Sequence, residues 1–127
     1  MADVASKVSK DFAIYSGNDD MIVPILSLGG LGVISVLSNI LPKQTHDMVM
    51  YYFNGEIQKA TELQLKLFDF IKALFIETNP IPVKTCLNLL GYEVGELRLP
   101  LCEMEEKNKK LLIRKLQDLG MELKKWE

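Results

Sequence analysis

One pattern occurs twice near the start of this chain, and it constrains the fold more than any other feature. Apolar runs at residues 12–16 and 32–36 each lead into small or polar residues. Between them lies the apolar segment 21–28, which is followed by the glycine pair 29–30. Strand, polar turn, helix, glycine stop and strand is the order of a βα repeat, whose parallel strands carry ligand sites at their C-terminal ends. The sequence therefore predicts an incomplete piece of an α/β enzyme.

The two predicted strands cover residues 12–16 and 33–36. Asn18 or Asp19 is placed to cap the helix between them, because short polar side chains accept hydrogen bonds from the free N–H groups of a first helical turn. Acidic side chains there also face the positive end of the helix. We expect this helix to end near Leu28, where glycine follows.

Helices dominate the rest of the predicted structure. The longest has an apolar residue at every third or fourth position, which predicts one buried face. Its apolar stripe comprises Ile57, Ala60, Leu63, Leu67, Phe70, Ile71 and Leu74. Prolines at positions 80 and 82 then interrupt the helical pattern. We expect helices at residues 2–10, 43–53, 83–90 and 105–119, and the longer helix that carries the stripe before the interruption at residues 77–82. Residues 97–100 are expected to be extended.

Size and charge fit one globular domain and exclude some partners. The 127 residues are 48% hydrophobic and 25% charged, which is ordinary for a soluble protein. The net charge of −2 is too small to imply a nucleic-acid partner. Basic residues gather between Lys107 and Lys125, but acidic residues alternate with them, so we interpret this segment as a solvated helix face.

The two cysteines, Cys86 and Cys102, lie in apolar contexts with no signal peptide before them. This combination suits a reducing cytoplasm, where both thiols act as small hydrophobic side chains; a disulfide between them is the alternative. Neither cysteine has metal-ligand spacing, and the single His46 does not make a zinc site. We therefore expect a cytoplasmic protein without a bound metal.

A membrane span is one further alternative. Residues 21–41 contain no charged side chain and are long enough to cross a bilayer. Pro24 and the glycines at 29, 30 and 32 would break such a helix in its middle. A buried helix, a glycine turn and a buried parallel strand explain the same run, since such strands are apolar on both faces. We expect no membrane partner.

Residue types with catalytic chemistry have plainer interpretations here. A lysine that acts as a nucleophile must be neutral, hence desolvated or beside another cation. Lys43 and Lys84 instead follow prolines at predicted helix starts, where surface or helix-packing roles are usual. Asp19 and Asp20 form a pair suited to acid–base work, but such a pair more often caps a helix. The segment 29–32 lacks the Lys-Ser/Thr of a phosphate-binding loop and is predicted to be a turn.

Four motifs follow one another along the chain. They are Ser-Gly-Asn-Asp at residues 16–19, Gly-Gly-Leu-Gly-Val-Ile-Ser-Val at residues 29–36 with Asn39, Glu-Thr-Asn-Pro-Ile-Pro-Val-Lys at residues 77–84, and Leu-Arg-Leu-Pro-Leu at residues 97–101. Together they resemble the dihydrodipicolinate synthase family, also called 4-hydroxy-tetrahydrodipicolinate synthase. Related pyruvate aldolases such as N-acetylneuraminate lyase share the architecture, but the second and third motifs look more like the synthase.

The resemblance implies a (β/α)8 TIM barrel followed by a helical domain. In this family a barrel lysine forms a Schiff base with pyruvate, which condenses with aspartate semialdehyde in the diaminopimelate route to lysine; no cofactor is implied. The two predicted strands match the seventh and eighth of the barrel. Residues 1–54 would then be the end of the barrel and residues 55–127 the C-terminal helical domain. The chain itself is expected to be mostly α-helical with two short parallel strands.

The resemblance carries over only part of the family's site. The Schiff-base lysine lies on strand six, and no motif of this chain matches it, so we assign no catalytic residue. Gly17 and Ile34 match positions that line the substrate pocket through their backbones. Asn18 and Asp19 match positions near the aldehyde substrate that are often acidic, and Asn18 departs from that pattern.

Two strands taken from a closed barrel expose their backbone edges and apolar faces. We therefore expect the chain to self-associate as a homo-oligomer, to join a missing N-terminal half, or to repack as a helical bundle. The first functional hypothesis is a lyase fragment that is inactive alone. The alternatives are a non-catalytic helical interaction or oligomerisation module, and another pyruvate aldolase of the N-acetylneuraminate lyase superfamily.

Overall fold

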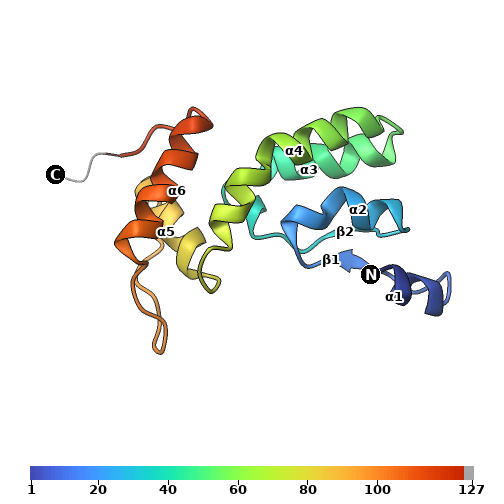
Figure 1. Ribbon diagram of the computed structural model, residues 1–127, viewed down its shortest axis with the longest axis horizontal. Coiled ribbons are helices and arrows are strands. Elements are labelled where there is room, and N and C mark those ends of the chain that lie inside the picture. Colours follow the sequence, from blue (N-terminus) through green and yellow to red (C-terminus); the bar gives the residue numbers. More distant parts are fainter. Residues whose placement is uncertain (125–127) are drawn as a thin grey trace. The chain divides into compact units, whose positions relative to one another are not determined.

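A computed structural model describes residues 1–124, which form two compact units divided between Phe68 and Asp69. Along the described chain the elements are α1 (Ala2–Lys7), β1 (Tyr15–Ser16), η1 (Asp19–Met21), α2 (Ile22–Ser27), β2 (Gly32–Val33), η2 (Leu37–Asn39), α3 (Pro42–Phe53), α4 (Ile57–Leu74), α5 (Ile81–Leu89) and α6 (Glu106–Asp118), where η marks a 3-10 helix (Figure 1). The prediction of a mostly helical chain with two short strands is confirmed. The barrel and helical domains predicted to meet after residue 54 stay a prediction.

The two strands pair in parallel, as the βα repeat predicted. Tyr15 lies opposite Gly32, and Ser16 lies opposite Val33. The backbone N–H of Ile34 also donates to the carbonyl of Ser16 at 2.8 Å, which continues the pairing past the end of β2. Helix α2 connects the strands and contacts both of them, as a βα unit requires.

Both strands are shorter than the sequence predicted. The predicted runs at residues 12–16 and 33–36 overlap the observed ladder only in part, and β2 begins one residue earlier than expected. A residue belongs to a ladder only where a neighbouring strand offers hydrogen-bonding partners. Hydrophobicity predicted longer strands than this pairing provides, and the side chains of Phe12 and Ile34 are 60% and 72% exposed.

The helix between the strands also begins later than predicted. Asn18 precedes the 3-10 turn η1 and Met21 precedes α2, and neither of these side chains caps the element that follows it. The expected helix start at Asn18 or Asp19 is therefore wrong, and α2 starts at Ile22. Its end agrees with the prediction, because Gly29 has a φ of +90°, a conformation that favours glycine after a helix.

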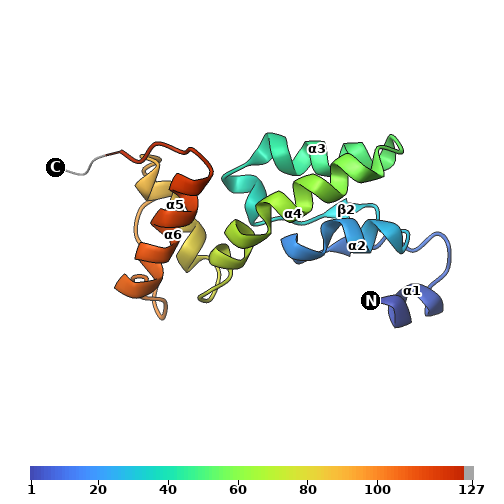
Figure 2. The same ribbon diagram turned by 45° about the horizontal axis from the view of Figure 1, so that its top comes forward.

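The first unit buries its core between helices and the strand pair. Helix α2 contacts α3, and α3 contacts η2. Helix α3 begins at Pro42, which occupies a first-turn position where no N–H is needed. Both views show α3 beside the first part of α4 (Figures 1 and 2). The buried apolar residues of the first unit include Ile22, Ile25, Leu26, Leu37, Met48, Ala60 and Leu67.

The second unit packs α5 against α6. Helix α5 starts two residues earlier than predicted, because Pro82 falls in its first turn rather than in its interior. On α6, Leu112 and Leu116 are buried, whereas Leu119, which follows the helix, is half-buried. The buried apolar residues of this unit include Phe70, Ile71, Leu74, Val83, Cys86, Leu89, Leu112 and Leu116.

The charged residues of α6 lie mostly on its exposed side, as the solvated-face interpretation predicted. Lys110 and Arg114 are exposed, and Lys115 forms an ion pair with Asp69 at 2.7 Å. Lys125, at the end of the predicted charged segment, lies outside the described residues.

The uncharged segment 21–41 folds as helix, glycine turn, strand and 3-10 turn. Across residues 1–124, no helix combines the length and the hydropathy needed to cross a bilayer.

Candidate functional site

The candidate site lies at the C-terminal ends of the two strands. Gly17 directly follows β1, and Ile34 directly follows β2. The bond from the Ile34 N–H to the Ser16 carbonyl brings these two positions to the same edge of the strand pair. Both residues are exposed, so this end of the strand pair is accessible from solvent.

Asp19 is fully buried and connects the two strand ends. Its Oδ2 accepts hydrogen bonds from the backbone N–H groups of Val36 and Leu37, each at 3.0 Å. Its Oδ1 accepts a hydrogen bond from the hydroxyl of Ser35. An ionised carboxylate is an acceptor only and therefore matches three donors. Asp19 thus caps η2 across the site rather than the helix that follows it in sequence.

Asn18 lies on the exposed side of the same turn. The Ser16 hydroxyl donates to the Asn18 carbonyl at 2.7 Å and accepts from the Asn18 N–H at 3.2 Å. Both bonds use the backbone of Asn18, so its side-chain amide stays exposed beside Gly17. The paired-carboxylate alternative loses support, since both oxygens of Asp19 are occupied while Asp20 is only half-buried.

The turn after β2 is held by its own polar side chains. The hydroxyl of Ser35 accepts the N–H of Ser38 at 2.9 Å, and the Ser38 hydroxyl donates to the Ser35 carbonyl at 3.0 Å. The side-chain amide of Asn39 donates to the Val36 carbonyl at 3.0 Å. The polar residues of this motif therefore shape the backbone that carries Ile34.

Sequence reasoning missed one residue of this network, Gln64. It is 5% exposed on α4, where its Nε2 donates to the Asp19 carbonyl at 2.9 Å and its Oε1 accepts the N–H of Val23 at 3.2 Å. A signal existed in the sequence, because Gln64 falls between Ala60 and Leu67 on the apolar stripe. A polar side chain on a buried face needs hydrogen-bonding partners. Ile57, by contrast, was predicted to be buried but is 44% exposed.

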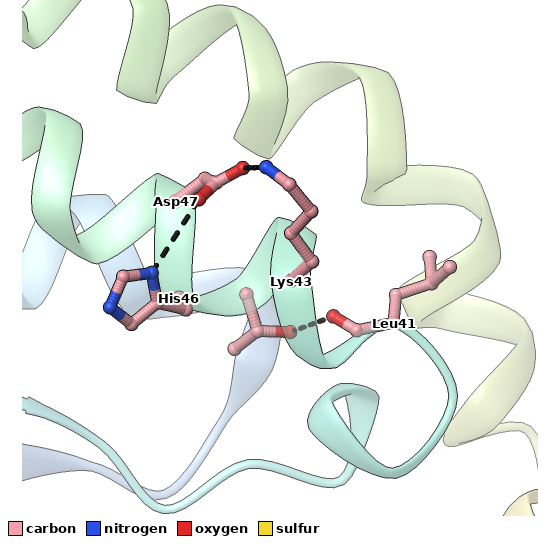
Figure 3. Close-up of polar contacts among 5 residues, drawn as sticks. Leu41, Lys43, His46 and Asp47 are labelled. Atoms are coloured by element: carbon pink, nitrogen blue, oxygen red, sulfur yellow. Dashed lines mark hydrogen bonds and ion pairs between the residues drawn. The ribbon is translucent and has the colours of Figure 1, made fainter.

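The lysines among residues 1–124 all keep some contact with solvent. Every lysine between residues 1 and 124 is exposed or half-buried. Figure 3 shows Lys43 paired with Asp47 on the first turns of α3, with His46 Nδ1 at 3.5 Å from the same carboxylate. The hydrogen bond from Lys43 lowers the pKa of Asp47, and the same bond raises the pKa of Lys43. A raised pKa keeps the ammonium protonated, the opposite of what a nucleophile needs.

Lys84, in the most distinctive motif, also has a structural role. It lies on α5, is half-buried, and donates from Nζ to the carbonyl of Glu96. This bond ties the loop after α5 to the helix, which agrees with the helix-packing interpretation. Asn88 supports the same loop, because its Oδ1 accepts the N–H of Val94 at 3.1 Å.

The two cysteines differ in environment, although the sequence suggested that both pack as hydrophobic side chains. Both are free thiols; Cys86 is buried and Cys102 is exposed. Burial raises the pKa of Cys86 to about 12 from an ordinary value of 9.0. The expectation of a packed thiol is therefore confirmed for Cys86 and wrong for Cys102.

We expect a thiol reagent such as DTNB to label one cysteine of the folded chain rapidly at about pH 8, since only an accessible thiolate reacts. Urea should expose the second. The Cys102→Ser variant should remove the fast phase and leave the slow one. Two fast-reacting thiols in the native protein would contradict this assignment.

The raised pKa of Cys86 also predicts how stability depends on pH. Above pH 9.0, the ordinary pKa of the thiol, the unfolded chain releases a thiol proton that the folded chain retains. The free energy of unfolding should therefore fall as pH rises from about 9 towards 12.

Two parallel strands joined by a helix and followed by a helical unit are the elements expected at the end of an α/β barrel protein. The fold is that of the last two βα units of a (β/α)8 TIM barrel plus a helical C-terminal domain. The model of the dihydrodipicolinate synthetase family matches residues 1–119, and the chain belongs to this family.

Individual relatives agree with this assignment. The chain is 65% identical over 111 residues to the 4-hydroxy-tetrahydrodipicolinate synthase of Caldicellulosiruptor bescii, which covers 87% of this chain and 38% of that protein. It is 57% identical over 108 residues to the enzyme of the same name from Methanocaldococcus jannaschii, covering 85% of this chain and 37% of that protein. The chain thus spans about two fifths of the length of the curated relatives it matches.

Solved structures give the same result. Dihydrodipicolinate synthase from Aquifex aeolicus superimposes with a TM-score of 0.91 at 37% identity, over 98% of this chain and 42% of that one. The enzyme from Thermotoga maritima matches with a TM-score of 0.84 at 50% identity, over 87% of this chain and 38% of that one.

Proposed function

We propose that this chain is the C-terminal part of a 4-hydroxy-tetrahydrodipicolinate synthase, a lyase that joins pyruvate to aspartate semialdehyde in the diaminopimelate route to lysine. The observation that carries the proposal is the open edge where Gly17 and Ile34 meet at the ends of the parallel strands. Membership of the family and the names of the relatives support the reaction. We propose that Gly17 and Ile34 present backbone groups to the substrate there.

The two neighbouring polar residues have different proposed roles. The exposed amide of Asn18 lies beside Gly17, and we propose that it contacts the aldehyde substrate by hydrogen bonding rather than by charge. The Asp19 carboxylate is buried and occupied by three donors, so its proposed contribution to substrate binding is to hold the backbone of residues 35–37.

The chain alone is proposed to be inactive. Imine formation requires a neutral amine, and a lysine reaches that state by desolvation or by a neighbouring cation. No lysine of residues 1–124 is fully buried, and Lys43, Lys59 and Lys115 have raised pKa values because each is hydrogen-bonded to a carboxylate. We propose that a barrel strand outside this chain supplies the Schiff-base lysine, and that no cofactor takes part.

The surface around the strands supports a partner for this chain. Tyr15, Leu31 and Ile34 are 51%, 52% and 72% exposed, and all three lie on or beside the two strands. Exposed apolar side chains next to unpaired strand edges favour association. We propose that they are covered by the N-terminal half of a barrel or, in its absence, by a second copy of this chain.

Borohydride trapping with labelled pyruvate tests the proposal. The chain alone should take up no label, whereas a mixture with the preceding part of the Caldicellulosiruptor bescii relative should be labelled on that partner. The Gly17→Val variant should fold, because a Cβ there meets no atom within 4 Å, yet it should reduce labelling by filling the edge. Label on this chain would overturn the proposed inactivity, and inertness of the mixture would favour a non-catalytic helical interaction module.

A further inference from the structure

We infer that Gln64 is a positioning residue for the candidate site, acting through Asp19 on the turn that follows Ile34. It does not itself face the open edge, because it is buried on α4. Its importance for catalysis rests on the proposed function, whereas the positioning itself can be measured without a substrate.

Gln64 connects α4 to the start of α2. Val23 is the second residue of α2, and its N–H is one of those that a helix leaves without an internal partner. No side chain of the segment before α2 caps it. Gln64 supplies the missing acceptor through Oε1 at 3.2 Å, and its Nε2 donates to the carbonyl of Asp19 at 2.9 Å. The side-chain amide of Gln64 thus provides partners for both the N–H of Val23 and the carbonyl of Asp19, four residues earlier in the chain.

Asp19 connects Gln64 to the turn after β2. Gln64 binds the backbone carbonyl of Asp19. The Asp19 carboxylate binds the N–H groups of Val36 and Leu37 and the hydroxyl of Ser35. Both ends of one buried residue are therefore fixed, one from α4 and the other from the turn after β2. A shift of the Asp19 backbone must move its carboxylate and, with it, the turn that begins at Ile34.

Both hydrogen bonds of the Gln64 side chain are buried. Among the described residues, every buried side-chain nitrogen and oxygen has a hydrogen-bonding partner. Removing the Gln64 amide leaves the Val23 N–H and the Asp19 carbonyl without their partner, and the segment must relax to recover hydrogen bonds. Supporting hydrogen bonds of this kind set how accurately a site is held.

Amide hydrogen exchange and 1H–15N spectra of the full chain test the inference. In Gln64→Met, which keeps the length but loses both polar atoms, exchange at Val36 and Leu37 should accelerate at least about tenfold relative to core amides of the same unit, and the Ile34 resonance should shift. Gln58→Met is the matched control, because Gln58 is an exposed residue of the same helix. It should leave these signals unchanged.

A second variant separates the two bonds and covers a failure of the first variant to fold. Gln64→Glu keeps an acceptor for Val23 but has no donor for the Asp19 carbonyl when ionised, so it should perturb Val36 and Leu37 while Val23 stays protected. A uniform acceleration of all amides in either variant would reduce Gln64 to a packing role and overturn the inference. A wild-type mixture that traps no pyruvate would count against the proposed function and leave the exchange result standing.

Discussion

Replacing Asp19 by leucine should lower the free energy of unfolding by about 3–5 kcal/mol, the cost expected when a buried, fully paired carboxylate is removed. Leucine has the same branching at Cγ but offers no acceptor to Ser35, Val36 and Leu37. The Leu37 N–H is buried, so water does not readily replace the lost partner. Urea denaturation of the purified chain, with intrinsic fluorescence or circular dichroism as the signal, measures the change.

The matched control is Asp19→Asn, which keeps one acceptor oxygen. That oxygen can face the N–H groups of Val36 and Leu37, while the new NH2 group faces the hydroxyl of Ser35, which then acts as acceptor. We expect a loss of only about 1 kcal/mol, because neutral hydrogen bonds replace charge-assisted ones. Equal losses for the two variants would mean that the carboxylate does not hold this turn.

The second large effect is expected in the other unit. Leu112 on α6 is fully buried, and truncating it to alanine removes apolar contacts and leaves a cavity. Such truncations cost about 2–5 kcal/mol in the core of a protein. Denaturation monitored by α-helical circular dichroism should show this loss.

Leu111→Ala provides the comparison for Leu112→Ala, since the chemical change is identical and the residue is adjacent. Leu111 is only half-buried, so the same truncation should cost less than about 1.5 kcal/mol. If both variants lose the same free energy, then α6 is not packed through the face that includes Leu112 and Leu116.

Much of the local structure could be predicted because it depends on short-range pattern. The period of the apolar stripe predicted one long helix where α4 lies, and Pro42 and Gly29 predicted a helix start and a helix end. The errors in strand length and in the start of α5 have different causes. Strand length depends on pairing with a neighbour, and the early start of α5 depends on whether Pro82 falls in a first turn or an interior.

The candidate site was predicted less completely than the helices. Gly17 and Ile34 were selected through family resemblance, and the parallel pairing then brought them to one edge. Asp19 was selected too, but its expected capping partner was wrong, because its carboxylate binds a turn that begins 16 residues later in the sequence. Gln64, whose bond to Asp19 spans 45 positions, was not selected at all.

The sequence by itself therefore determined the order of strands and helices and the helix stops, because these depend on periodicity, proline and glycine within a few neighbouring residues. Only the tertiary structure decided which polar side chains are buried and what they bind. Hydrogen-bonding partners such as those of Asp19 and Gln64 are distant in sequence and become neighbours only when the strands pair and α4 packs beside them. A local sequence pattern does not indicate these long-range hydrogen bonds. At this site they determine how the open edge is held.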